Sequence, residues 1–275
     1  DEGSPSSGSS AVAAMVGLGL GMVLYMFLMI YGAMVMQSVI EEKSSRVLEV
    51  VVSSVRPFEL MMGKIFGVAS VAVVQVLIWA VLVCGAGAAV MPHVLPDGAM
   101  EAAAALQQGG GAATAAAGDF DPETLGAIAL ATDVGYLAML FGYLLLFVVG
   151  GYLLYSAMFA AVGSAVDNAQ DAAQLQTPIM IPIILAVIVE MSVLNDPNSP
   201  LAFWFSLIPF TSPVVMMARI PYGIPTWEIV LSLVLLYAAF VGMVWLSAKI
   251  YRVGIFMYGK KPTLREMFRW IRYKY

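Results

Sequence analysis

Residues 41–64 read EEKSSRVLEVVVSSVRPFELMMGK, and an apolar run long enough to cross a membrane lies on each side of this charged stretch. These two runs, residues 11–40 and 65–91, contain no charged residue. Crossing the hydrocarbon core of a bilayer takes a helix of about 20 apolar residues. We therefore expect the chain to cross a membrane on either side of residues 41–64 and to turn there.

The composition of the 275-residue chain is typical of a protein that crosses a membrane several times. Hydrophobic residues make up 61% of it and charged residues 11%, whereas soluble domains carry about 25% charged residues. Cys84 and His93 are the single cysteine and the single histidine. An intrachain disulfide is therefore impossible, and a metal site built from His and Cys is not expected.

Five apolar segments predict five spans, at about residues 11–40, 60–91, 134–166, 177–195 and 226–250. The predicted fold class is therefore all-α, a polytopic membrane helix bundle. Region 197–225 does not fit a simple span, because Pro209 and Pro213 interrupt it and a twice-broken helix would leave backbone groups unpaired in lipid. We predict a re-entrant or interfacial hairpin there; a sixth, kinked span is the alternative.

The basic residues predict how the chain is oriented. Four of the 13 lie in residues 41–64 and eight lie in residues 249–274. Because positive charge gathers on the cytoplasmic side, both regions are expected there, at the inner face of the cell membrane. Residue 1 and the loop 92–133 are then outside. The transmembrane domain covers residues 11–252, after a stub at 1–10 and before a basic cytoplasmic tail at 253–275.

The outside position of residue 1 raises a question about what precedes it. No apolar segment in residues 1–10 would carry this end across the membrane. We therefore expect a preceding span, six in the parent protein, and an outside domain. Translocation of a short acidic tail is the alternative. The basic tail, next to a span, is interpreted as an anchor to anionic lipid rather than as a nucleic-acid site.

Residues 41–56 form an amphipathic pattern. On a helical wheel one polar stripe faces an apolar side of valines and a leucine, and Pro57 is suited to the first turn of a following helix. The mixed charge favours docking into a protein groove, whereas a passive interfacial helix is usually rich in lysine. The stripe consists of Glu42, Arg46, Glu49, Ser53 and Arg56.

Two segments resemble a known family. The stretch at 41–64, and SAMFAAVGSAVDNAQDAAQLQTPIMIPIILAV at 156–187, are similar to type 2 ATP-binding-cassette (ABC) permeases, especially the NatB-like sodium-exporter branch. The resemblance implies a permease subunit of an exporter that works with a second permease copy or a paralogue. It also implies that 41–56 is a coupling helix that docks on a separate ATP-binding subunit, which would hold ATP and Mg while this chain holds no cofactor. The implied docking residues are Glu41, Glu42, Arg46 and Glu49.

Glu190 is the one acidic residue deep in an apolar run. An Asp at the centre of a membrane helix costs about 2.5–3.5 kcal/mol on insertion scales. Glu190 could therefore line the translocation route or meet a cation. The alternative is that it reaches the outer interface or pairs with Arg219.

The stretch GIFMYGKK at 254–261 matches the first seven positions of a Walker A motif, but we do not interpret it as one. Lys261 stands where Ser or Thr is required, and the stretch follows a membrane helix instead of a strand. We therefore expect no ATP hydrolysis by this chain and no other enzymatic activity. A secondary transporter or a channel-like protein without an ATPase partner is the alternative to the permease. Sodium as the cargo follows only from the resemblance, and an apolar cavity would equally allow drugs, peptides or lipids.

Overall fold

The computed structural model describes residues 7–45, 56–95, 98–107, 122–257 and 263–270, and every element within these ranges is helical. Five helices are long and apolar enough to cross a membrane, which confirms the predicted all-α bundle of five spans. These are α1 (Ser7–Ser44), α3 (Pro57–Val94), α7 (Val134–Ala165), α8 (Ala169–Val193) and α11 (Thr226–Gly254).

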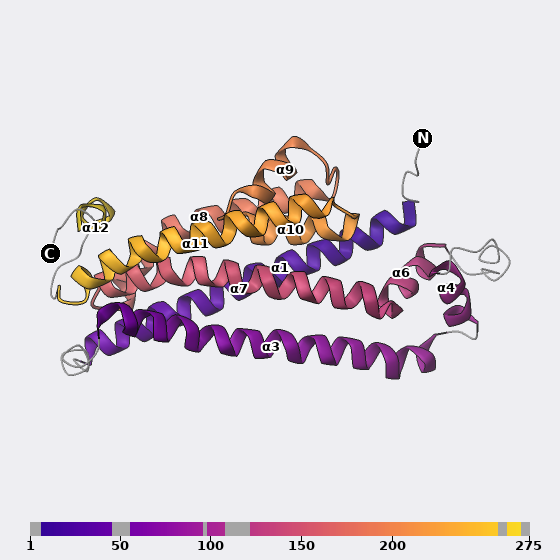
Figure 1. Ribbon diagram of the computed structural model, residues 1–275, viewed down its shortest axis with the longest axis horizontal. Helices are drawn as coiled ribbons and strands as arrows, with labels where there is room; N and C mark the ends of the chain where they lie inside the picture. Colours follow the sequence, from indigo (N-terminus) through magenta and orange to yellow (C-terminus); the bar gives the residue numbers. More distant parts are fainter. Residues whose placement is uncertain (1–6, 46–55, 96–97, 108–121, 258–262, 271–275) are drawn as a thin grey trace.

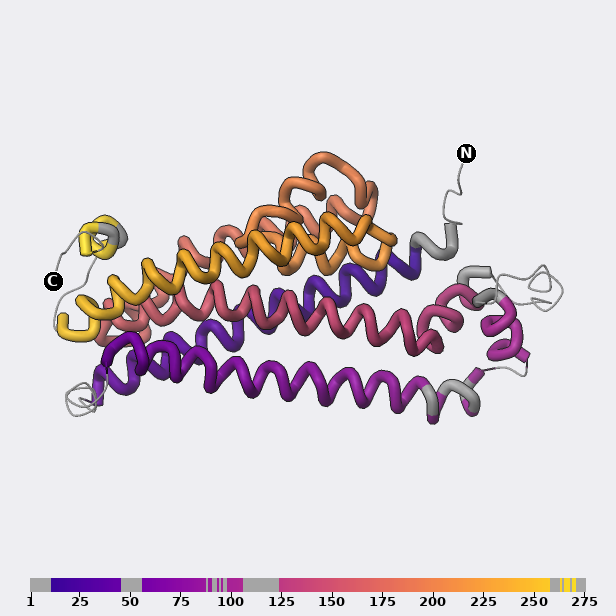
Figure 2. Tube along the Cα trace, viewed as in Figure 1, coloured from indigo at the N-terminus to yellow at the C-terminus, as the bar shows by residue number. Residues whose placement is uncertain are grey.

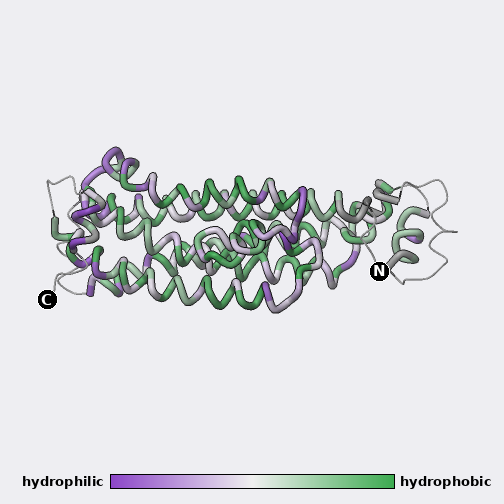
Figure 3. Tube along the Cα trace, turned by 90° about the horizontal axis from the view of Figure 1, so that it is seen from above, coloured by the Kyte–Doolittle hydropathy of each residue, from purple (hydrophilic) through white to green (hydrophobic). Residues whose placement is uncertain are grey.

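Three of the short helices lie at the two ends of the bundle, whereas α9 and α10 lie along its side, next to α8 and α11 (Figure 1). α12 lies beside the end of α11, and α4 and α6 lie together at the opposite end of the bundle. The hydropathy colouring in Figure 3 is mostly green along the bundle, with much of the purple near the C-terminal end. The short elements are α4 (Ala99–Gln107), α6 (Pro122–Thr132), α9 (Pro200–Leu207), α10 (Ser212–Arg219), the 3-10 helix η1 (Ile220–Tyr222) and α12 (Leu264–Trp270).

The central element is α7, which packs against α1, α3, α8 and α11. Its second half is almost entirely buried, from Gly150 to Ala165. Many large apolar side chains of α3 and α11 remain exposed, Val81 and Val241 among them. Exposed apolar side chains on membrane helices face lipid or other apolar partners, so these faces fit a bilayer setting.

A hairpin of two short helices precedes the last span, as predicted (Figure 2). α9 and α10 have eight residues each, which at 1.5 Å per residue is far too short to cross a bilayer. The break between them keeps its backbone groups bonded: the Tyr155 hydroxyl donates to the Phe210 carbonyl at 2.6 Å, and the Thr211 hydroxyl donates to the Phe205 carbonyl at 2.6 Å. Internal partners of this kind allow irregular backbone inside a membrane protein.

The start of α8 differs from the sequence-based boundary. The helix begins at Ala169 instead of residue 177, so Pro178 and Pro182 both lie inside it and neither is in its first turn. The earlier start has a local cause. Asn168 is the N-cap, and its side-chain oxygen accepts a hydrogen bond from the Asp171 backbone N–H at 2.9 Å, which satisfies one of the free donors of the first turn.

Glycines allow α1 to approach its neighbours closely. A Cβ on Gly163 of α7 would lie 2.8 Å from the Met36 carbonyl oxygen of α1. The GxxxG pair in α1 also packs within the chain, because a Cβ on Gly17 would collide with the Ala218 carbonyl and one on Gly21 with the Glu190 carboxylate. Small residues permit such close backbone contact in membranes.

We predict that Gly163→Ala lowers the free energy of unfolding by about 1–3 kcal/mol, because the added methyl meets backbone that cannot move aside. Gly142→Ala in the same helix is the matched control, since nothing lies within 4 Å of its Cβ position. The control should be neutral, or stabilise α7 by up to about 1 kcal/mol through helix propensity. Thermal unfolding in detergent measures both; equal stabilities would contradict the close α1–α7 contact.

Candidate functional site: the charged end of the bundle

The end of α1 is joined to the beginning of α3 by an ion pair. The Lys64 ammonium lies 2.7 Å from a carboxylate oxygen of Glu42. It also donates to the Ser38 carbonyl at 2.9 Å and to the Ser38 hydroxyl at 3.1 Å. The Lys64 side chain is only 11% exposed, so this pair is better shielded from water than an ordinary surface salt bridge. It therefore holds the two helices together on either side of their connection.

Lys43 links α1 to three other parts of the chain. Its side chain is fully buried, and its ammonium donates to the carbonyls of Ser164 at 2.8 Å and Gly254 at 2.9 Å. These carbonyls belong to the last turns of α7 and α11, where unpaired carbonyls and the helix dipole favour a cation. The Asp167 carboxylate, between α7 and α8, lies 3.1 Å from the same ammonium.

From the sequence, Lys43 was only one of the basic residues that predict how the chain is oriented in the membrane. A more specific signal was present in the helical spacing. Met36, Val39 and Ile40 are buried core residues of α1, and Lys43 follows them at a spacing of three or four residues. It therefore lies on the buried side of α1. A lysine that continues an apolar stripe indicates an internal partner for its charge.

The predicted docking residues divide into two groups. Glu41 and Glu42 lie at the end of α1, which continues to Ser44. They therefore extend the first span and do not begin a separate helix. Glu41 is exposed, whereas Glu42 is partly covered and engaged with Lys64. Arg46 and Glu49, and most of the predicted helix 41–56, lie outside the described residues.

Glu190 is fully buried in α8, so the interpretation that it reaches the outer interface is wrong. The pairing with Arg219 is wrong as well. The Arg219 guanidinium lies 2.9 Å from Glu228 at the start of α11. Among the described residues, neither carboxylate oxygen of Glu190 has a hydrogen-bond partner.

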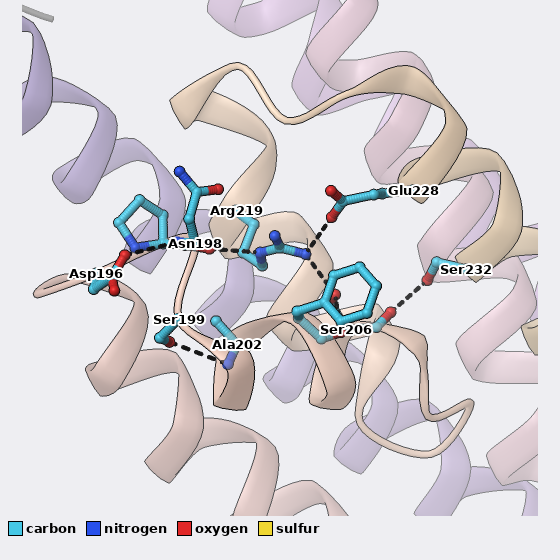
Figure 4. Close-up of polar contacts among 10 residues, drawn as sticks. Asp196, Asn198, Ser199, Ala202, Ser206, Arg219, Glu228 and Ser232 are labelled. Atoms are coloured by element: carbon cyan, nitrogen blue, oxygen red, sulfur yellow. Dashed lines mark hydrogen bonds and ion pairs between the residues drawn. The ribbon is translucent and has the colours of Figure 1, made fainter. Parts of the chain in front are cut away.

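Arg219 has its own set of partners near the C-terminal end of α8 and the N-terminal end of α11 (Figure 4). Besides Glu228, it donates from Nε to the Pro197 carbonyl at 2.8 Å and from a terminal nitrogen to the Ser206 hydroxyl at 2.7 Å. The Ser232 hydroxyl in turn donates to the Ser206 carbonyl at 2.7 Å. This network joins α9, α10 and α11. The buried guanidinium thus has the several hydrogen bonds that offset the cost of its desolvation.

Within the described ranges, no three side chains of His, Cys, Asp or Glu come close enough together to hold a metal ion. The charged groups described above instead form three cation-centred networks, around Lys43, Lys64 and Arg219, with Glu190 apart from them in α8. These are arrangements for holding helices in register, and none places a nucleophile beside a base.

The family model described as "ABC-2 family transporter protein" matches residues 4–249. The chain belongs to this family. Membership makes this ABC-2 chain a membrane transport component and not an enzyme, in line with the five apolar helices of the fold.

Two curated relatives resemble this ABC-2 chain. The Bacillus subtilis (strain 168) protein described as "Uncharacterized protein YhaP" is 27% identical over 246 residues, which cover 89% of this chain and 52% of that protein. The Methanocaldococcus jannaschii protein described as "Uncharacterized protein MJ1024" is 27% identical over 254 residues, covering 92% of this chain and 52% of that protein. The chain thus spans about half the length of these relatives. No solved structure matches it.

We predict that Lys43→Met destabilises this ABC-2 chain by about 1–3 kcal/mol, because the helix-end carbonyls at Ser164 and Gly254 lose a buried donor. Arg252→Met is the matched control, since Arg252 is an exposed cation near the same end of α11 and should change stability little. Thermal unfolding in detergent distinguishes the two. A Lys43→Met protein as stable as the Arg252→Met protein would show that the buried ammonium does not hold these helices.

Proposed function

We propose that the chain is the permease part of an ABC exporter, driven by separate ATPase subunits that dock at the end of the bundle carrying residues 41–56. The observation that carries this proposal is the ABC-2 family match over residues 4–249. ATP and Mg would be bound by the partner subunit. A second copy of the chain, or a paralogue, would complete the transport route.

The contacts of α1 support a role for this end as the input of mechanical force. Residues 41–44 form the end of α1, and residues 45–56 connect it to α3. The Lys43 and Lys64 contacts tie these helix ends to each other and to α7 and α11. A displacement of the segment would therefore reach four spans through packed helices and ion pairs. Glu41, Glu42, Arg46 and Glu49 are the proposed contacts to the ATPase, with Glu42 also serving the internal pair with Lys64.

The proposed setting is the inner membrane of the cell, with the C-terminus cytoplasmic and residue 1 outside. The distribution of basic residues supports this orientation. It is also compatible with the arrangement of the helices, because the end of α1, the beginning of α3 and the end of α11 lie at one end of the bundle (Figure 1). An odd number of spans places the two termini on opposite sides.

Copurification tests the proposal. The full-length protein, purified from membranes of its native organism, is expected to copurify with an ATP-binding subunit, and the complex is expected to carry out ATP-dependent transport in proteoliposomes. Failure to associate with any ATP-binding subunit, together with transport driven by an ion gradient alone, would contradict the proposal and favour a secondary transporter.

Charge reversal locates the docking site. Glu41→Lys with Glu49→Lys should weaken ATPase binding roughly tenfold, about 1.4 kcal/mol, because mismatched charges disfavour the encounter and the register of the helix in its groove. Neither substitution replaces Glu42 or Lys64 itself. Glu101→Lys is the control, since Glu101 is exposed in α4 at the opposite end of the bundle. Equal binding by all three proteins would remove the docking claim without affecting the permease proposal.

Sodium is the cargo that we propose to test first, since residues 41–64 and 156–187 resemble the NatB-like branch. Proteoliposomes containing the copurified complex should move ²²Na against its gradient when ATP is supplied on the ATPase side. A complex that hydrolyses ATP while the sodium distribution stays unchanged would contradict sodium as the cargo.

A further inference from the structure

Glu190 occupies a closed position between α8 and α1. Its exposed fraction is 0%, and neither oxygen has a hydrogen-bond partner among the described residues. The carboxylate is pressed against the backbone of α1, because a Cβ on Gly21 would lie 2.6 Å from the Glu190 Cδ. An unpaired charge in such a place would carry a desolvation cost that no nearby contact offsets.

The elements packed against α8 supply little charge to balance an ionised carboxylate. These elements are α1, α7, α9 and α10. α7 and α9 contain no Asp, Glu, Lys, Arg or His, and in α1 such residues begin only at Glu41, twenty residues from Gly21. α10 contributes Arg219, which is already bonded to Glu228, Ser206 and Pro197. The remaining titratable groups on these elements are the tyrosines Tyr25, Tyr31, Tyr136, Tyr143, Tyr152 and Tyr155.

The space around the carboxylate favours a proton over a metal ion as the group that neutralises it. A bound metal cation needs several oxygen ligands arranged around it. The Glu190 oxygens lie against Gly21, where a Cβ would come within 2.1 Å of one of them, and no cluster of three His, Cys, Asp or Glu side chains surrounds them in the described part of the chain. A proton adds no such requirement, and a neutral carboxylic acid is far cheaper to bury than a carboxylate.

We propose that Glu190 is a proton-binding site: it holds a proton while α1 and α8 are in contact and releases it when they part and water enters. This inference rests on the burial of Glu190 against Gly21 and does not depend on the ATPase proposal. The contact between α1 and α8 is then coupled to proton binding, because the packed arrangement holds one more proton than the parted one. By linkage, a rise in pH must then favour the parted arrangement.

Infrared spectroscopy of the full-length protein, in a detergent without ester groups, tests the site directly. The wild-type minus Glu190→Gln difference spectrum at neutral pH is expected to contain the carbonyl stretch of a protonated carboxylic acid, and Glu190→Asp should shift that band. A difference spectrum that contains only carboxylate bands would overturn the proposal.

Thermal stability provides a second measurement with a worked-out sign. Glu190→Gln resembles the protonated side chain in shape and charge, so it should unfold at about the wild-type temperature at pH values below about 4, where the Glu190 carboxyl group is protonated in the unfolded chain as well. As the pH rises, the wild type should lose stability relative to Glu190→Gln, because its folded form holds a proton that its unfolded form releases. Parallel pH profiles for the two proteins would overturn the proposal.

Two nearby glycines of α1, Gly21 and Gly19, provide a test of the Glu190 contact and its matched control. Gly21→Ala should displace the Glu190 carboxyl group, weaken the protonated-acid band and lower the unfolding temperature. Gly19→Ala should leave both unchanged, since nothing lies within 4 Å of a Cβ at that position. If Gly21→Ala leaves the band unchanged, the proton is not held at this contact.

Discussion

The Lys43 ammonium is the contact on which the arrangement of the bundle most depends. It lies between the last turns of α7 and α11 and beside Asp167, so one side chain fixes the ends of α1, α7 and α11, and the connection between α7 and α8, relative to one another. The Ser164 carbonyl lies in the last turn of α7, where the final carbonyls lack helical partners, and the Gly254 carbonyl accepts from Lys43 in addition to the Met257 backbone N–H. Moving α1 along its axis would separate the ammonium from both carbonyls at once, which makes the register of α1 specific.

Arg219 also holds helices together, toward the opposite end of the bundle. It joins the short helices α9 and α10 to α11 through Glu228, Ser206 and Pro197. Apolar packing alone is weakly directional and would permit many sliding arrangements of long helices. Two buried cations with several hydrogen bonds each reduce these arrangements to one. A transporter that moves between states must break or shift such contacts as units, since packed cores are bistable.

Between these networks lies Glu190, which differs from both cations because no partner is supplied to it among the described residues. Lys43 and Arg219 are held by complementary charges, whereas the Glu190 side chain only packs into the space beside Gly21. A site of that kind is sensitive to the separation of two helices, whereas a fully bonded ion pair is not easily disturbed by small movements. Lys43 and Arg219 therefore hold the helices in register, whereas Glu190 is the group that we infer to respond when α1 and α8 separate.

The sequence by itself determined the number of spans, the helical hairpin before the last one and the exclusion of a Walker A site, because these depend on local length, hydropathy and proline positions. It placed the start of α8 too late, since the cap at Asn168 outweighs the polarity of the residues that follow. Only the tertiary structure decided which charges meet. Lys43 and its carbonyl partners are 121 and 211 residues apart, and Arg219 pairs with Glu228 instead of Glu190. Such pairings depend on how whole helices rotate and pack against one another, which no local pattern specifies.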